Sequence, residues 1–404
     1  MKRCNRCGLP ETHETISFDN EGICSICRQH EYKQNKIDWK ENKQRLDSLI
    51  EEHRGRYDYD CIIPFSGGKD STWTLYYLVK EYGIKPLVVR FDHGFMRPNL
   101  EDNVKRVSRK LGVDILTFTP NWKVVQKLML QSFLDKGDFC WHCHTGIFSY
   151  PMWVAIEKKV PLIFWGEPSA EYTSYYTYDQ VEEVDEQRFN RYVNLGISAD
   201  DMFVRLEGVV DERDLKPYTY PPLQELRDLK YQSVCLGSFI PWDAKKQSEI
   251  INQELGWQGD CVENVPPEYS YEKIECYMQG VRDYIKFIKR GYSRPSHLVA
   301  LDVRNQKMSK EHGEKLIRTY EGKRPPSLDL FLQFVGLTED EFLDIAMSHQ
   351  VSPYVHEPEK TQSGDHTPDF ESWSRDGLMP QEDANEQISR WRACNKCNTT
   401  NCKS

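Results

Sequence analysis

The sequence has no long hydrophobic run and no excess of positive charge. Its 404 residues include 53 Lys and Arg against 63 Asp and Glu, so the formal net charge is −10, and the mean hydropathy is −0.70. No apolar run approaches the length of a membrane span, and Met1–Cys7 lacks the apolar core that a signal peptide needs. These absences argue against a membrane-spanning chain and predict a cytoplasmic protein.

The lack of a net positive charge also limits which partners the chain is expected to bind. A protein that grips a long nucleic acid usually has a basic balance or a basic stripe, which neutralises phosphates. With a pI near 5.7, this chain is expected to act on a small molecule, with neither nucleic acid nor membrane as a partner. Assembly into a homo-oligomer stays open.

Cysteine, in contrast, is abundant, with 13 residues. An odd number grouped in pairs two residues apart is typical of metal ligands rather than disulfides. Cys4-x2-Cys7 and Cys24-x2-Cys27 supply four thiols, which complete a tetrahedral zinc shell with no open position. Residues 1–35 are therefore predicted to form a zinc-ribbon module that stabilises the fold. Four unligated thiols are the alternative.

The middle of the chain alternates between short apolar runs and amphipathic segments. Such alternation predicts the α/β class, with a Rossmann-like parallel sheet that binds ligands at the carboxyl ends of its strands. The expected strands are Cys61–Phe65, Pro86–Phe91, Asp114–Phe118, Leu162–Trp165 and Ser233–Leu236, and the expected helices are Trp39–His53, Ser71–Tyr82, Asn99–Leu111, Trp122–Leu134 and Phe148–Lys158.

The same patterns divide the chain into four parts. After the zinc module we expect an α/β domain at 36–247, a helical region at 248–350 and a loosely ordered tail at 351–404, which contains Cys394, Cys397 and Cys402. The tail cysteines could bind a metal or remain free thiols.

Between Glu171 and Asp228 the alternation stops, and Tyr and acidic residues accumulate. This stretch is expected to cover the site or meet a partner, or else to be a solvated acidic face.

The stretch from Ser66 to Ser71 carries the clearest chemistry. Its sequence, Ser66-Gly67-Gly68-Lys69-Asp70-Ser71, lies between a predicted strand and a predicted helix. Backbone N–H groups and the positive end of the helix dipole then face an anion, and the two glycines let the backbone approach it closely. The stretch is too short for the Walker pattern. It predicts a phosphate-binding loop, and an ordinary Gly-rich turn is the alternative.

This loop resembles the SGGxDS loop of the PP-loop ATP pyrophosphatases, which cleave ATP to AMP and pyrophosphate. The resemblance implies ATP and Mg²⁺ as ligands and assigns ATP binding to Ser66, Gly67, Gly68, Lys69, Asp70, Ser71, Phe91, Asp92 and Gly166. It also implies catalytic roles for Lys69, Asp70 and Glu167, with Glu167 and Asp70 on the metal side. An alternative for Glu167 is that it merely caps the following turn.

A second cysteine group suggests a further cofactor. Cys140-Trp141-His142-Cys143-His144 precedes a predicted helix, and Cys235 ends a later strand. Cys140, Cys143 and Cys235 resemble the three-Cys cluster of PP-loop tRNA thiolases, which holds a [4Fe–4S] cluster. Zinc bound with help from His142 or His144 is an alternative, and so is a pair of cysteines that binds nothing.

A basic segment narrows the family. Residues 283–294, followed by His297 and Asp302-Val303-Arg304, could be a solvated basic face. Together with the Cys-rich module and Cys140–Cys143, however, they resemble the N-acetyl sugar amidotransferases of lipopolysaccharide, pseudaminic acid and legionaminic acid synthesis. The resemblance covers roughly residues 1–347 and implies that Arg290, Arg294, His297 and Arg304 bind an activated N-acetyl sugar. The family's Arg-Ala-Thr-Asp-His is replaced here by Arg294-Pro295-Ser296-His297.

The implied reaction adenylates the acetamido oxygen of the sugar and replaces it with ammonia, which gives an amidine. Because the chain shows no glutaminase pattern, separate glutaminase subunits are expected to supply the ammonia. A PP-loop sulfur transferase acting on tRNA is the main alternative. The three-Cys group favours it, whereas the acidic balance and the Arg290–Arg304 segment oppose it. A nucleotide-binding assembly subunit with a degraded site is a third reading, which the intact Ser66–Ser71 loop opposes.

Overall fold

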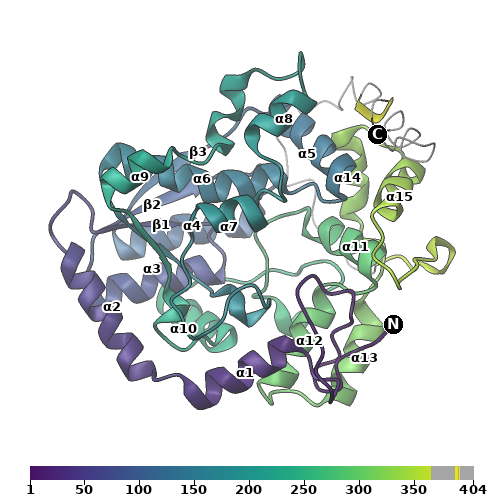
Figure 1. Ribbon diagram of the computed structural model, residues 1–404, viewed down its shortest axis with the longest axis horizontal. Helices are drawn as coiled ribbons and strands as arrows, with labels where there is room; N and C mark the ends of the chain where they lie inside the picture. The colour runs from purple at the N-terminus through teal and green to yellow at the C-terminus, as the bar shows by residue number, and fades with distance from the viewer. Residues whose placement is uncertain (365–386, 390, 392–404) are drawn as a thin grey trace.

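The structure is a computed structural model that describes residues 1–364, 387–389 and 391 (Figure 1). Cys394, Cys397 and Cys402 lie outside the described residues. The chain starts in a small module without long secondary structure, and α1 (Ser25–Lys36) and α2 (Trp39–His53) then lead to the sheet. The Asp38 carboxylate caps α2 by accepting hydrogen bonds from the N–H groups of Lys40 and Glu41.

A five-stranded parallel sheet forms the centre of the molecule, in the order β3-β2-β1-β4-β5. The strands are β1 (Cys61–Pro64), β2 (Pro86–Phe91), β3 (Asp114–Phe118), β4 (Leu162–Trp165) and β5 (Gln232–Cys235). The predicted α/β class with a parallel sheet, an N-terminal four-Cys module and a C-terminal helical region is confirmed.

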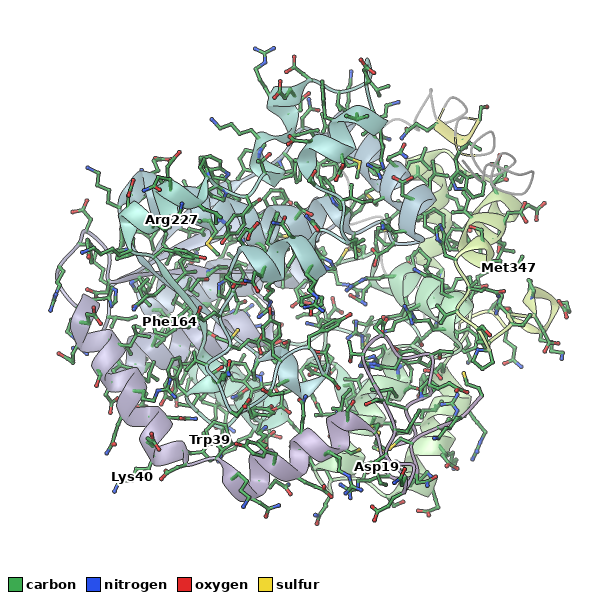
Figure 2. The ribbon with its side chains drawn as sticks, in the orientation of Figure 1. Asp19, Trp39, Lys40, Phe164, Arg227 and Met347 are labelled. Carbon is green, nitrogen blue, oxygen red and sulfur yellow. The ribbon has the colours of Figure 1, made fainter. Side chains whose placement is uncertain are left out.

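Alternate residues of β1 point to opposite faces of the sheet, and helices cover both faces. Cys61 and Ile63 pack in a core cluster with residues of α2, α3 (Lys69–Tyr82) and α10 (Ala244–Leu255). Ile62 packs in a second cluster with residues of α6 (Trp141–Lys158). Phe164 of β4 is fully buried between these layers, whereas Lys40 points outward (Figure 2). Burial on both faces explains why the strands read as apolar runs.

The remaining helices complete the α/β part and add a helical part. In the α/β part they are α4 (Pro98–Leu111), α5 (Trp122–Lys136), α7 (Glu186–Arg188), α8 (Ala199–Arg205) and α9 (Leu223–Leu229). In the helical part they are α11 (Gln279–Arg290), α12 (Arg294–Arg304), α13 (Lys310–Tyr320), α14 (Ser327–Val335) and α15 (Glu339–Ser348). Among the described residues, every helix is too short or too polar to cross a membrane.

A third core cluster joins the two parts. Phe133 of α5 packs with Phe331 of α14 and Phe342 of α15, and buried residues of α11 complete the cluster. This packing holds α11 next to the α/β part. It places the basic C-terminal segment within reach of the strand ends.

The strand order creates a switch point beside β1. After β1 the chain adds β2 and β3 on one side, and it then crosses to β4 on the other side. The loops that follow β1 and β4 therefore face the same crevice, which is where open parallel sheets bind ligands. These loops are Ser66–Gly68 and Gly166–Pro168.

Candidate active site at the β1 and β4 strand ends

The phosphate loop, Ser66–Ser71, is organised by its own hydroxyl groups. The N–H groups of Ser66 and Gly67 both donate to the Ser71 hydroxyl at 3.3 Å, and that of Gly68 donates to the Ser66 hydroxyl at 3.2 Å. The N-terminus of α3 has no side-chain cap. Backbone donors that converge in this way, at the positive end of a helix dipole, can bind a phosphate.

Two distant contacts hold the phosphate loop in shape. The Trp257 indole N–H donates to the Gly67 carbonyl at 2.9 Å. Gly67 has a φ of 86°, and a Cβ atom there would lie 2.7 Å from Val104 of α4. Glycine is therefore needed at this position for both its conformation and its lack of a side chain.

Lys69 is the cation of the loop and is only 2% exposed. Its ammonium lies 2.7 Å from a carboxylate oxygen of Asp70 and 3.1 Å from one of Glu272. Burial alone would lower the pKa of Lys69, but Asp70, Glu272 and Glu167 overcome that effect and hold the pKa well above its usual value. Lys69 is therefore charged and is shared between two carboxylates.

Glu167, the predicted catalytic acid, follows β4. Burial, and next the Asp70 carboxylate, raise its pKa to about 8. Gly166 lets this turn approach α3, because a Cβ atom at Gly166 would lie 3.0 Å from the Thr74 hydroxyl. The structure thus brings Lys69, Asp70 and Glu167 together at the switch point.

Sequence reasoning missed the segment Glu272–Glu275, which lies over the phosphate loop. Glu272 is 2% exposed and pairs with Lys69. The Glu275 carboxylate fills the space beside Gly68, where a Cβ atom would approach its oxygen to 1.9 Å. Nothing local in the sequence marks these residues, because they reach the loop from about 200 residues away.

Phe91 and Asp92, the two predicted adenosine contacts, have structural partners. The Phe91 ring is buried, packs on Phe118 and Tyr218, and would collide with any side chain at Gly146 of α6. The Asp92 carboxylate accepts hydrogen bonds from the Gly94 N–H and the Thr119 hydroxyl. The Phe91 ring therefore packs in the core, and its contact with adenosine stays a prediction.

A cavity of about 540 Å³ extends from Glu167 along α11, and we call it the α11 cavity. Its lining includes residues of the 171–228 stretch, namely Tyr172, Thr173, Tyr175, Arg191, Tyr192 and Leu195. That stretch therefore covers part of the site, which is one of its two expected roles. Because Glu167 lines the cavity and also faces Lys69, the cavity and the phosphate loop share one residue.

The α11 cavity is strongly cationic, although the whole chain is acidic. Its charged lining residues are Lys136, Arg191, Lys273, Arg282, Lys286, Lys289, Arg290 and Arg294 against Glu14, Asp138, Glu167 and Asp283. Arg282, Lys286, Lys289 and Arg290 are spaced so that they share one face of α11. A cavity with this excess of positive charge is suited to an anionic ligand.

Three of the four predicted substrate residues line the α11 cavity, namely Arg290, Arg294 and His297. Arg294 pairs with Asp283 at 3.3 Å. Burial, and next the nearby Lys286, hold the pKa of His297 well below its usual value, so its ring is neutral. The Lys286 ammonium donates a hydrogen bond of 3.1 Å to Nε2 of the neutral His297 ring.

Arg304, the fourth predicted substrate residue, lies outside the α11 cavity. It is 4% exposed and donates to the Glu171 carbonyl at 3.1 Å. Arg304 ends α12, and its Nε and Nη1 atoms are buried without a hydrogen-bond partner among the described residues. Its contact with the sugar stays a prediction.

The N-terminal four-Cys group has the geometry of a zinc site. Cys4, Cys7, Cys24 and Cys27 are buried, and their sulfur atoms all lie within 4.8 Å of one another. Cys4 and Cys27 Sγ are 3.9 Å apart, and Cys7 and Cys24 Sγ are 3.7 Å apart. A tetrahedron with Zn–S distances of about 2.3 Å requires S···S distances of about 3.8 Å. The four thiols therefore fit zinc.

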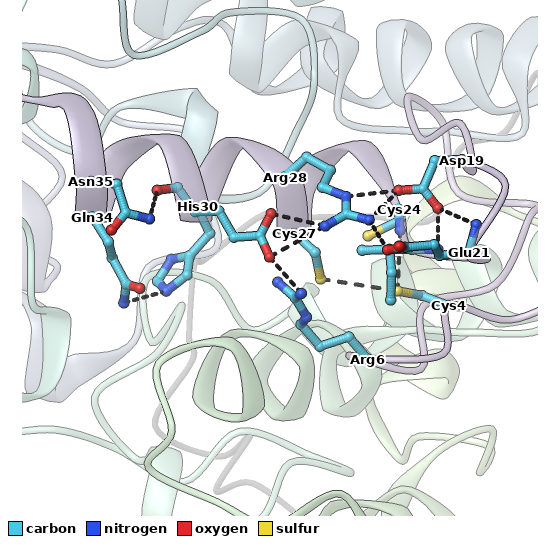
Figure 3. Close-up of polar contacts among 12 residues, drawn as sticks. Cys4, Arg6, Asp19, Glu21, Cys24, Cys27, Arg28, His30, Gln34 and Asn35 are labelled. Carbon is cyan, nitrogen blue, oxygen red and sulfur yellow. Dashed lines mark hydrogen bonds and ion pairs between the residues drawn. The ribbon is translucent and has the colours of Figure 1, made fainter.

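Polar contacts brace this module on its outer side (Figure 3). Arg28 on α1 pairs with Asp19, Glu21 and Glu31, and Glu31 also pairs with Arg6. These pairs connect the loop between the two cysteine pairs to the helix that follows.

The structure places Cys235 in a different core cluster from Cys140. The Cys235 thiol lies beside Glu182 and Arg188, in the core cluster under α6. Cys140 packs with Cys276 in the third core cluster instead, and Cys143 lies in the first turn of α6, which begins at Trp141. Among the described residues, the N-terminal four-Cys group is the one set of three or more ligand residues close enough to share a metal ion. With Cys235 and Cys140 in different core clusters, the [4Fe–4S] cluster stays a prediction.

Comparison with known proteins adds two findings. Over 116 residues, the chain is 28% identical to an uncharacterized protein of Methanocaldococcus jannaschii; the match covers 28% of this chain and 41% of that protein. Residues 268–364 match a family model described as "LPS biosynthesis protein WbpG-like, C-terminal domain". The matched range contains Glu272, Glu275 and the cationic face of α11. The similarity supports a role for this chain in lipopolysaccharide biosynthesis.

Proposed function

We propose that the protein is an ATP-dependent amidotransferase that converts the acetamido group of a nucleotide-activated N-acetyl sugar to an acetamidino group. The observation that carries the proposal is the position of Glu167. It belongs both to the charged group around Lys69 and to the wall of the cationic α11 cavity. A nucleotide at the phosphate loop and a second ligand in the cavity would therefore meet at one residue.

The phosphate loop supplies the ATP end of the reaction. Its convergent N–H groups and the α3 N-terminus suit the β and γ phosphates, which leave together as pyrophosphate. Asp70 and Glu167 are the carboxylates that would contact Mg²⁺, which needs only one or two carboxylates beside the phosphate oxygens. When bound, Mg²⁺ would neutralise phosphate charge.

The α11 cavity supplies the sugar end. The cations of α11 suit the phosphates of an activated sugar, since Arg pairs bidentately with such groups and Lys supplies a point charge. Tyr172, Tyr175 and Tyr192 offer flat surfaces and hydroxyl groups for the sugar. The match of residues 268–364 to a lipopolysaccharide biosynthesis domain agrees with a sugar substrate.

The reaction balances without a covalent enzyme intermediate. The acetamido oxygen attacks the α-phosphorus of ATP, an O-adenylyl imidate forms and pyrophosphate leaves. Ammonia then attacks the imidate carbon, the C–O bond breaks, and AMP leaves with the former amide oxygen. The chain's task is to position the two ligands and to stabilise the departing pyrophosphate. We expect ammonia to come from a separate glutaminase subunit.

The test is a reaction with and without each component. The purified protein is incubated with MgATP, ammonium chloride and UDP-N-acetyl sugars, and AMP and sugar mass are measured. We expect AMP formation that depends on both sugar and ammonium, and a product slightly lighter than the substrate because NH replaces O. AMP formation without a change in sugar mass, or no AMP with any sugar, would contradict the proposal.

A further inference from the structure

A loop of the zinc module forms part of the wall of the α11 cavity. His13, Glu14 and Thr15 all line the cavity. The Thr12 hydroxyl donates to the Arg290 carbonyl, and the Arg290 guanidinium donates back to the Thr12 carbonyl. On its other side, the Thr15 hydroxyl accepts the Ser174 N–H at 2.9 Å. The loop is therefore fixed to α11 and to the 171–228 stretch at once.

Glu14 places a carboxylate among the cations of this wall. Its carboxylate lies 3.3 Å from the Lys286 ammonium and 3.4 Å from the Arg290 guanidinium, and it accepts the Tyr292 hydroxyl. Burial alone would raise the pKa of Glu14, but Lys286, His13 and Arg290 hold it well below its usual value. The side chain is still 34% exposed. Glu14 is thus a charged group that a ligand can reach.

The cationic residues that line the α11 cavity outnumber the acidic ones. Eight cationic residues line it against four acidic ones. Arg282 shares the α11 face with Lys286, and among the described residues it has no direct ion pair. Burial alone would lower the pKa of Arg282, but Asp138 and Asp283 act on it from farther away and both raise it. A ligand with a single negative charge that displaced Glu14 would only exchange one anion for another. A ligand with two or more charges would pair Lys286 and Arg290 and also neutralise Arg282.

We propose that Glu14 is a resident counter-ion of an anion-binding subsite, and that a diphosphate group takes its place on Lys286 and Arg290 while Arg282 pairs with the same ligand. This rests on the proposed function, since the diphosphate is that of a nucleotide-activated sugar. It makes the zinc module part of the substrate site. Glu14 then selects multiply charged ligands over single small anions.

The experiment measures binding, without turnover, by titration calorimetry with UDP and separately with ATP. Glu14→Gln keeps an acceptor for Tyr292 but removes the competing charge. We expect it to tighten UDP binding about five- to tenfold. Arg282→Gln should weaken UDP binding about tenfold. Neither change should alter the affinity for ATP.

Glu21→Gln is the matched control. Glu21 lies in the same zinc module but is 74% exposed, pairs with Arg28 and does not line the cavity. We expect wild-type affinity for UDP in this variant. Equal zinc content and equal circular dichroism spectra in all variants show that the module is intact.

Two results would overturn the proposal. If Glu14→Gln weakens UDP binding or leaves it unchanged, Glu14 orients the cations or merely packs the loop. If UDP fails to bind the wild-type protein, the cavity is not a diphosphate site. The titrations measure binding and need no amidine formation. A failed amidotransferase assay would therefore not change the binding result, and a failed binding test would not change the result of the assay.

Discussion

Glu167 lies between the charged group around Lys69 and the cationic α11 cavity. Its pKa of about 8 distinguishes it from an ordinary exposed carboxyl. In the unfolded chain the same group ionises near its ordinary value of 4.5. The folded state therefore binds this proton more tightly, and unfolding releases it at intermediate pH. By linkage, the contribution of Glu167 to stability falls as pH rises from about 4.5 towards 8.

Glu167→Gln should remove this pH dependence. We expect the variant to be more stable than the wild type at pH 9, on the order of 1–2 kcal/mol after allowance for solvent screening. The difference should shrink towards pH 5. Thermal unfolding of the ligand-free protein across this range measures it. A difference that is constant with pH would show that Glu167 is not the titrating group.

Lys69 and Glu272 allow a test of coupling between the phosphate loop and the segment Glu272–Glu275. Lys69→Met leaves the Asp70 and Glu272 carboxylates without their shared cation, and such a loss costs about 3–5 kcal/mol for a buried pair. Adding Glu272→Gln should recover part of this loss, because one of the two facing charges disappears. Urea unfolding of the single and double variants measures the coupling. Strictly additive losses would mean that the two residues do not interact.

At the scale of elements, the strands and their flanking helices could be predicted from sequence because each is a local pattern. The first and last residues of β1 to β4 agree with the predicted bounds to within one position, because Gly, Pro and charged residues flank these apolar runs. In the structure, α6 begins at Trp141, earlier than the predicted start at Phe148. Its first turns carry Cys, His and Gly, which do not show a helical apolar period.

Contacts between distant elements were not predictable in the same way. Glu272 and Glu275 reach the phosphate loop, and the zinc-module loop reaches α11, across long stretches of chain. Cys235 ends a strand as expected, yet its side chain faces Glu182 rather than Cys140. The neighbours of a side chain at a strand end depend on which helix packs there. That packing cannot be predicted from a single sequence.

The phosphate loop and the end of α3 offer a matched pair of glycines. Gly67 and Gly83 have φ of 86° and 63°, so alanine is strained at both positions, by about 1–2 kcal/mol. At Gly83 nothing lies within 4 Å of an added Cβ atom, whereas at Gly67 the atom would lie 2.7 Å from Val104. Gly67→Ala should therefore destabilise the protein by about 1–3 kcal/mol more than Gly83→Ala.

ATP binding separates the two substitutions further. Gly67→Ala moves the backbone donors of the phosphate loop and should weaken ATP binding, while Gly83→Ala, at the far end of α3, should leave it unchanged. Fluorescence titration with ATP measures both. Equal affinity in both variants would remove the phosphate loop from the ATP site.

At the scale of the whole molecule, three parts contribute to one site. The sheet supplies the phosphate loop and Glu167, and the helical part supplies Glu272 and the cations of α11. The zinc module adds Glu14 beside them. In Figure 1, α1 and α2 run along one edge of the molecule and carry the chain from the zinc module to the sheet. The two reactants would meet where these parts converge, at Glu167.

The most direct test of this account follows one oxygen atom. A UDP-N-acetyl sugar with heavy oxygen in its acetamido group is incubated with the protein, MgATP and ammonium chloride, and the AMP is examined by mass spectrometry. Adenylation of the amide oxygen predicts that the label leaves the sugar and appears in AMP, in step with formation of the lighter amidino sugar. Unlabelled AMP, with the label still on the sugar, would contradict the proposed reaction.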